Sequence, residues 1–162
     1  MRVKRFLSRK VLVVTVLAVV ALGLTGCMPD TSATPPSDPY TNALYNAMNR
    51  DRASVGLPPL TWSPKLAVNA GGWAGIMAQA GTLYHQNLGG LLYQPLYAPY
   101  YTLGENILVG PGNMSADQVE AAWRASSAHW ANITSRSFNV VGIGYYRGPD
   151  GRLWAVQEFG GI

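Results

Sequence analysis

The sequence predicts an α+β domain in which helices lie on both sides of a small, mainly antiparallel sheet. Three observations favour this fold. Apolar residues at helical spacing occur early in residues 40–162, and segments rich in alternating β-branched and aromatic residues occur at the end. A turn sequence at 148–151 separates the last two of these segments. A sheet of this kind buries its apolar faces under helices.

Residues 1–26 have the pattern of an export signal. Five of the twelve basic residues fall in the first ten positions, and Val11 to Leu24 carries no charge. A bilayer span needs roughly 20 apolar residues, so this run is short for a stable anchor. Without residues 1–26, seven basic side chains face eight acidic ones. That balance excludes a basic surface for phosphates, and therefore a nucleic-acid partner.

The segment Leu24-Thr25-Gly26-Cys27 resembles a bacterial lipobox, in which cleavage precedes the cysteine and the thiol carries diacylglycerol. We expect Cys27 to anchor the protein to the extracytoplasmic face of the cell membrane. The alternative is a plain signal peptide with an incidental cysteine. Because Cys27 is the only cysteine, no intramolecular disulfide can form, and the domain must be held by its core.

Residues 27–39 are predicted to be a lipidated cysteine followed by a tether rich in proline, serine and threonine. The remaining residues, 40–162, have the length of one compact domain, which we expect to be monomeric.

The first helix is predicted from Tyr40 to Ser54, and Gly56 ends it. Pro58-Pro59 then forces an extended connection. Ser63-Pro64 is typical of a helix N-cap and first turn, and Gly81 ends this second helix. Its apolar face consists of Leu66, Ala70, Trp73 and Met77. Its glycines, at 71, 72 and 75, weaken it and could let a neighbouring segment approach closely.

A third helix opens with the capping-box pair Ser115 and Gln118. One side of this helix is predicted to carry Val119, Ala122, Trp123 and Ser126. Strands are predicted at 103–109, 139–146 and 152–159, and the last two form a hairpin across the turn at 148–151.

Seven sequence pieces occur in a fixed order along the domain. They are Asn49-x-x-Arg52-x-x-x-Gly56-Leu57-Pro58-Pro59-Leu60, Trp62 to Ala67, His85 in LYHQNL, Gly104-Glu105-Asn106-Ile107, Trp123-x-x-Ser126-x-x-His129-x-x-Asn132-Ile133, Val141-Gly142-Ile143-Gly144, and Trp154 to Gly160. In this order they resemble the bacterial branch of the CAP superfamily, or SCP domain, which includes cysteine-rich secretory proteins, insect antigen 5 and plant pathogenesis-related proteins. The resemblance covers nearly all of residues 40–160 and implies a three-layer α-β-α sandwich.

In that family, two histidines and two glutamates line a cleft. The matching motifs imply that His85, Glu105 and His129 belong to it. Ser126 stands where the family has its second glutamate, three residues after the helix tryptophan. Glu120 lies about 240° from Ser126 around a helix and cannot take its place.

Two interpretations of this cleft follow. Two imidazoles and a carboxylate are the ligand types of a three-ligand zinc site with an open position, so His85, Glu105 and His129 could hold a divalent metal such as zinc. Alternatively, Glu105 holds the two imidazoles by hydrogen bonds and orders the loops, with no cofactor required. The spacing of the three residues matches no sequence motif for metals.

Ser126 and His129 would share one face of a helix, as a nucleophile and its base would in a hydrolase. The sequence has neither a Gly-x-Ser-x-Gly elbow nor an evident oxyanion loop, so we do not expect catalysis there. The segment Leu91 to Leu103 holds four tyrosines and joins His85 to Glu105. It either forms an aromatic wall for an apolar or sugar ligand, or packs its tyrosines onto the domain. Trp123 and Trp130 are expected to support the core and the cleft.

Three functions remain open, in order of preference. The first is a non-enzymatic, lipid-anchored protein that binds a small lipid or a cell-wall ligand in the cleft. The second is a protein-interaction module of the cell envelope with a purely structural cleft. The third is a metal-dependent hydrolase.

Overall fold

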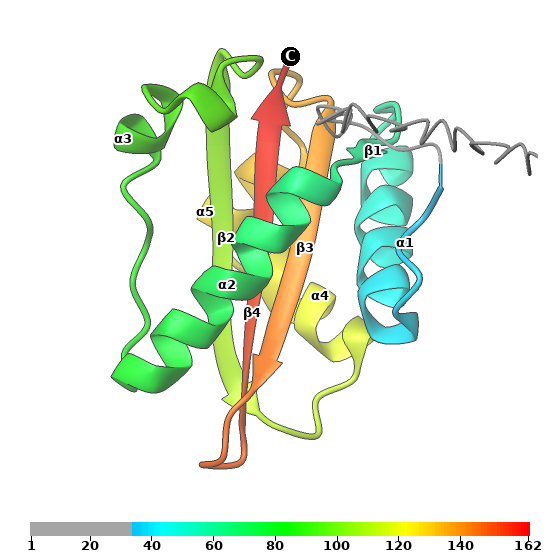
Figure 1. The fold of residues 1–162 in the computed structure, drawn as a ribbon. Coiled ribbons are helices and arrows are strands. Elements are labelled where there is room, and N and C mark those ends of the chain that lie inside the picture. The colour runs from blue at the N-terminus through cyan, green and yellow to red at the C-terminus, as the bar shows by residue number, and fades with distance from the viewer. Residues whose placement is uncertain (1–33) are drawn as a thin grey trace, which may run out of the picture.

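The computed structural model describes residues 34–162 (Figure 1). The predicted export signal, the lipobox and Cys27 lie outside these residues. The last part of the predicted tether belongs to the domain, because Asp38 caps helix α1 (Pro39–Ser54) and accepts a hydrogen bond from the Thr41 amide at 2.7 Å. Within residues 34–162, no helix is both long and apolar enough to cross a membrane.

Four strands form one sheet in the order β1-β3-β4-β2. The strands are β1 (Thr61–Trp62), β2 (Thr102–Pro111), β3 (Val140–Arg147) and β4 (Arg152–Gly161). Strand β4 pairs antiparallel with both β2 and β3, whereas β1 pairs parallel with β3. The predicted mainly antiparallel sheet is therefore confirmed. The two-residue β1 lies in the connection that was predicted only as extended.

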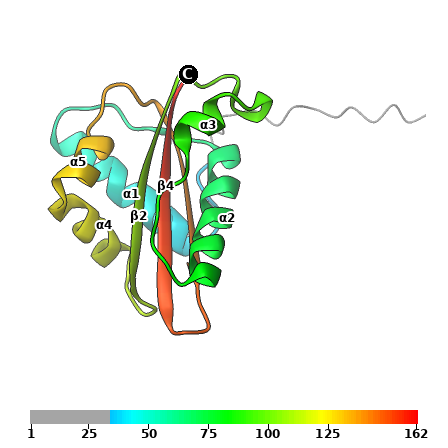
Figure 2. The ribbon, with the colours of Figure 1, turned by 90° about the vertical axis from the view of Figure 1, so that its left-hand side faces the viewer.

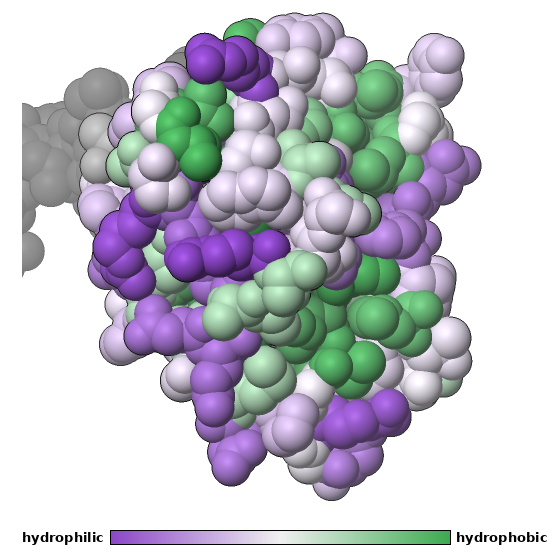
Figure 3. Space-filling model, turned by 180° about the vertical axis from the view of Figure 1, so that it is seen from behind, coloured by the Kyte–Doolittle hydropathy of each residue, from purple (hydrophilic) through white to green (hydrophobic). Residues whose placement is uncertain are grey.

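Helices cover both faces of the sheet, which confirms the three-layer sandwich (Figure 2). One face carries α2 (Pro64–Ala80) and the short α3 (Leu88–Leu92), followed by a 3-10 turn at Pro95–Tyr97. The other face carries α1, α4 (Ala116–Ala125) and α5 (Ser127–Ile133). Seen from the side of α1, α4 and α5, hydrophilic and hydrophobic side chains are intermixed (Figure 3).

The larger part of the core lies between the sheet and α1, α4 and α5. Its fully buried residues include Leu44, Met48, Trp123, Ile133 and Phe159. A second cluster packs α2 against the other face, with Ala70, Ala74 and Met77 on Ile107, Trp154 and Val156. Trp73, predicted on the apolar face of the second helix, packs against this cluster at its margin and is only partly buried.

Two glycines of β3 bring the sheet against the backbone of α2. A Cβ atom on Gly142 would overlap backbone atoms of Leu66 and Ala67, and one on Gly144 would overlap Gly71. A Cβ on Gly71 or Gly72 themselves would meet nothing within 4 Å. The strand glycines therefore permit the close approach that was predicted from the helix glycines.

The third predicted helix breaks at Ser126. This residue has extended backbone angles, φ −95° and ψ 120°, and it ends α4 and caps α5. The buried residues of α4 are Ala116, Val119, Glu120 and Trp123, and Ala122 is exposed. The predicted apolar side of this helix is wrong at Ala122, because the buried face is rotated toward Glu120. It is also wrong at Ser126, because the chain turns there.

The Asn49-x-x-Arg52 motif ties α1 to two loops. Asn49 exchanges two hydrogen bonds with the backbone of Leu60. Arg52 is 1% exposed and donates to the carbonyl groups of Pro58, Ile133 and Ser135. A buried guanidinium is tolerated here because three carbonyl oxygens accept from it.

Candidate functional site

The candidate site lies at strand β2, an edge strand of the sheet. Successive side chains of a strand point to opposite faces, so Glu105 faces α2 and Asn106 faces α5. Their direct partners on β4 are Glu158 and Gln157, respectively. The site therefore has one set of polar groups on each face of the sheet.

On the α2 face, Glu105 holds the segment that follows α2. Its carboxylate accepts from the Gln86 amide at 3.1 Å and from the Gln86 carboxamide at 2.8 Å. The Nδ1 atom of His85 lies 2.7 Å from Glu105 Oε1. The Glu105 side chain is fully buried, whereas the His85 side chain is 57% exposed. The buried carboxylate of Glu105 thus holds His85 and Gln86, while the imidazole of His85 stays open to solvent.

A second buried carboxyl group lies beside Glu105. Asn69 of α2 donates to Glu158 Oε2 at 2.6 Å and to Gln86 Oε1 at 2.8 Å. Within residues 34–162, Glu158 Oε1 has no hydrogen-bond partner. The pKa of Glu158 is raised to about 7, chiefly by burial. The charge of Glu105 also raises this pKa, whereas the hydrogen bonds from Asn69 and Gln86 lower it.

The sequence analysis did not identify Glu158 as part of the site. The available signal was a charged residue inside an alternating strand, between Gln157 and Phe159. A strand covered on both faces buries every side chain, and a carboxyl group there needs polar partners.

On the opposite face, α5 is held against β2 by amide side chains. Asn106 donates to the His129 carbonyl at 3.1 Å and to Gln157 Oε1 at 3.0 Å. Asn132 donates to the Glu105 carbonyl at 3.1 Å. These bonds hold the backbone of His129 on the face of β2 opposite to the Glu105 side chain.

His129 is the second histidine of the predicted cleft. Its Nδ1 atom is buried and has no partner within residues 34–162. Burial lowers the pKa of His129, and the neighbouring His85 lowers it as well. The arrangement therefore favours a neutral imidazole, the form that binds metals.

Ser126 does not form a nucleophile–base pair with the His129 ring. Its Oγ accepts the backbone N–H of His129 at 3.5 Å, as the N-cap of α5. Glu120 lies on the face of the sheet opposite to the Glu105 side chain, where Gln157 donates to it at 3.0 Å. The pKa of Glu120 is raised to about 8, chiefly by burial.

As arranged, the site does not match a three-ligand zinc centre. Among residues 34–162, no three histidine, cysteine, aspartate or glutamate side chains come together closely enough to hold a metal ion. His85 and Glu105 are in contact, whereas His129 does not complete a group of three with them in this arrangement.

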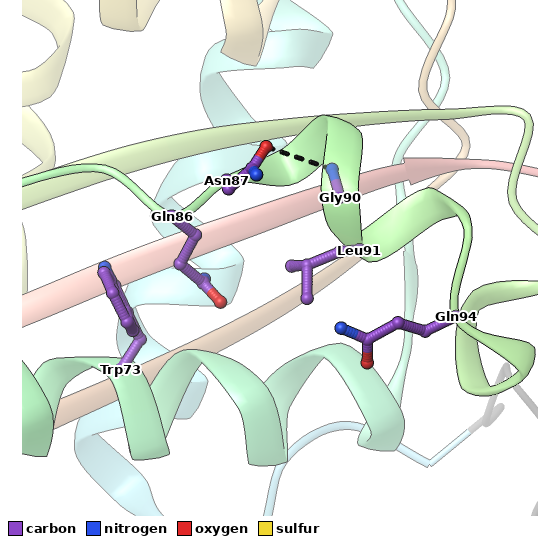
Figure 4. A pocket seen from close by; sticks show the side chains of 6 residues that line it. All are labelled: Trp73, Gln86, Asn87, Gly90, Leu91 and Gln94. Atoms are coloured by element: carbon purple, nitrogen blue, oxygen red, sulfur yellow. Dashed lines mark hydrogen bonds between the residues drawn. The ribbon is translucent and has the colours of Figure 1, made fainter.

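A pocket of about 340 Å³ adjoins the Glu105 cluster on the α2 face. It is lined by Trp73, Gln86, Asn87, Gly90, Leu91 and Gln94. The side chains of Gln86, Leu91 and Gln94 point into the space above α2, and Trp73 stands at one end of it (Figure 4). Gln86 belongs to both the pocket and the His85–Glu105 cluster.

The tyrosines of residues 91–103 do not line this pocket. Tyr97 and Tyr100 are buried against Leu66 and Val140, whereas Tyr93 and Tyr101 are exposed. The segment contributes Leu91 and Gln94 to the pocket instead. Trp123 is fully buried in the core and Trp130 packs against the core, which confirms the core part of their expected role.

The protein is thus an α-β-α sandwich domain with a four-stranded sheet and a histidine–glutamate contact at an edge strand. Residues 45–159 match the model of the cysteine-rich secretory protein (CAP) family. The chain therefore belongs to the CAP family.

Three bacterial proteins illustrate the relationship. YkwD of Bacillus subtilis, an uncharacterized protein, is 28% identical over 141 residues, which are 80% of this chain and 51% of that protein. The chain thus spans about half the length of this relative. An outer surface protein of Borrelia burgdorferi has the same fold, with a TM-score of 0.67 and 19% identity over 78% of this chain and 95% of its own. An extracellular SCP-domain protein of Bacillus anthracis has a TM-score of 0.62 and 25% identity over 76% of this chain and 40% of its own.

Proposed function

We propose that this CAP domain is a non-enzymatic protein of the cell envelope that binds a small lipid or cell-envelope ligand beside the His85–Glu105 cluster. The observation that carries the proposal is the pocket of about 340 Å³ that shares Gln86 with this cluster. Because Glu105 fixes Gln86 through two hydrogen bonds, one wall of the pocket is preorganised before a ligand arrives.

The contacts of the site support binding more than catalysis. A serine hydrolase needs a hydroxyl group within hydrogen-bond reach of a general base. Ser126 instead uses its hydroxyl oxygen to cap α5, and Glu105 is engaged by His85 and Gln86. These groups hold segments together, which is what a preformed binding site requires.

The location outside the cytoplasm is part of the proposal. The export pattern of residues 1–26 and the lipobox at Cys27 support it. Two proteins of similar structure, an outer surface protein of Borrelia burgdorferi and an extracellular protein of Bacillus anthracis, agree with it. A Cys27→Ala variant is expected to lose the acyl mass and to leave the membrane fraction. Unchanged mass and membrane retention in that variant would contradict the lipid anchor.

Native mass spectrometry of the protein purified from its own membrane tests the binding function. We expect a co-purifying small molecule that is depleted when Glu105→Gln loosens the Gln86 wall. The exposed Gln79→Ala on α2 is the matched control and should retain the ligand. A ligand-free protein would favour an interaction module, and ester or peptide hydrolysis abolished by His129→Ala would favour an enzyme.

A further inference from the structure

We propose that the pocket between α2 and α3 binds a neutral saccharide unit, with Trp73 as the stacking surface and Gln86 and Gln94 as hydrogen-bonding groups. This inference rests on the proposed function and names the ligand class of the same site. It follows from the side chains that line the pocket, their partners and their lack of charge.

Trp73 is an indole held in a fixed orientation at the end of the pocket. Its Nε1 donates to the Tyr84 carbonyl at 3.0 Å. The Tyr84 ring meets it edge-on, with centroids 4.9 Å apart and planes at 76°. The indole is partly buried, and it lines the pocket. A fixed aromatic face suits the C–H groups on one side of a pyranose ring, because those groups are weakly positive and the π-face is negative.

The polar groups of the pocket are carboxamides. The Gln86 carboxamide is fixed by Asn69 and Glu105. The Gln94 carboxamide makes no hydrogen bond with other residues in the described part of the chain, and it points into the pocket (Figure 4). The Gln94 carboxamide can both donate and accept hydrogen bonds, as a sugar hydroxyl does. The Gln86 carboxamide donates to Glu105 and Glu158, so it offers a sugar hydroxyl the remaining acceptor site of its oxygen.

Size and charge narrow the ligand class. About 340 Å³ is near the lower end of the range of about 300–1,000 Å³ for small-molecule pockets, which suits one or two rings. No charged side chain is among the lining residues, so nothing there compensates an anionic group. The Gln94 side chain, on an exposed residue at the pocket, favours a hydroxylated ligand that can pair with its carboxamide over an acyl chain that cannot.

The test uses the full-length protein in detergent, titrated by calorimetry with cellotriose and with triacetylchitotriose. We expect at least one of the two sugars to bind. Trp73→Leu keeps an apolar side chain but removes the stacking face, and Gln94→Ala removes a side chain without structural bonds. Each is expected to weaken binding by about tenfold or more, while Gln79→Ala on α2 binds as the wild type does.

Three outcomes separate this inference from the proposed function. If neither sugar gives heat at concentrations up to roughly 10 mM, the saccharide assignment is overturned, because a Kd above that concentration means very weak binding. If native mass spectrometry then still shows a bound lipid, the binding function stands and only the ligand class is wrong. Sugar binding that is unchanged in both Trp73→Leu and Gln94→Ala also overturns the assignment to this pocket.

Discussion

Glu105 and Glu158 are direct partners across strands β2 and β4, and both side chains are buried on the face covered by α2. Two carboxylates in this arrangement repel each other, and the pKa of Glu158 is raised to about 7, chiefly by burial. The raised pKa favours the protonated form of Glu158 at a pH where an exposed glutamate is ionised. A proton on Glu158 relieves the repulsion between the two carboxyl groups.

The first prediction concerns the pH dependence of stability. The pKa values of Glu158 and Glu120 are raised from 4.5 to about 7 and about 8. Between the ordinary pKa of 4.5 and these raised values, the folded state binds more protons than the unfolded state does. The free energy of unfolding should therefore fall as pH rises from 5 to 8. We expect a loss on the order of 2 kcal/mol for each carboxyl group.

Urea denaturation at several pH values checks this prediction. Glu158→Gln should flatten the decline relative to wild type, whereas Asp117→Asn, an exposed control, should not. The lowered pKa of His129 acts in the opposite direction near pH 6.5, so the informative quantity is the difference between variant and wild type. Equal slopes for Glu158→Gln and wild type would contradict the shifted pKa.

The second prediction concerns the contact between β3 and α2. Gly144→Ala places a methyl group against the backbone of Gly71, which cannot move without shifting the helix. We expect a loss of about 3 kcal/mol in the free energy of unfolding. Gly72→Ala is the matched control: its Cβ meets nothing, so it should stabilise the helix by about 0.5–1 kcal/mol. Thermal unfolding of both variants measures the difference, and equal melting temperatures would be inconsistent with the close contact.

The third prediction concerns Arg52. Arg52→Met fills a similar volume but leaves the carbonyl groups of Pro58, Ile133 and Ser135 without their donor. Because buried acceptors without partners cost about 1–3 kcal/mol each, we expect a loss of at least 3 kcal/mol, about the cost of the three together. Arg50→Met removes only an exposed ion pair with Asp117 and should cost about 0–1 kcal/mol. Similar denaturation midpoints for the two variants would show that Arg52 is not a structural anchor.

The fourth prediction concerns zinc. We expect calorimetry to show at best micromolar affinity, because His85, Glu105 and His129 do not form a three-ligand group as arranged and Ser126 stands where the family has a second carboxylate. His85→Ala and His129→Ala should each weaken binding, and the double variant should add little. Affinity should fall below about pH 6.5, because protons compete for the imidazole nitrogens. The absence of heat at millimolar zinc would leave the cluster as a hydrogen-bonded structural element.

Local patterns predicted the fold where local interactions decide it. Asp38, Ser63 and Ser115 all cap helices, and Ser115 forms the full capping box with Gln118. Ser63 and Ser115 could be recognised from sequence because a cap involves only a few neighbouring residues. The hairpin of β3 and β4 was predictable for the same reason.

Tertiary contacts decided the features that the sequence did not predict. Strand β1 exists through its pairing with Val140 and Val141, about 80 residues further along the chain. Trp73 has core-like spacing in α2 but only flanks the core cluster beneath that helix. The contact of His85 with Glu105 was expected only through the family resemblance, because the spacing of two residues in the sequence does not show that they meet in the fold. Glu158 was missed because its burial depends on α2 lying across β4.

Strand β4 follows every other element of the domain in the chain, yet it lies between β3 and β2. The β2–β4 and β3–β4 ladders cannot form until this strand is available. Strand β2, which carries Glu105, therefore has no strand partner while the chain is being synthesised. A chain that emerges from its N-terminus therefore cannot assemble the domain step by step. The last strand closes the structure in one event, and folding should be all-or-none and limited by these long-range pairings.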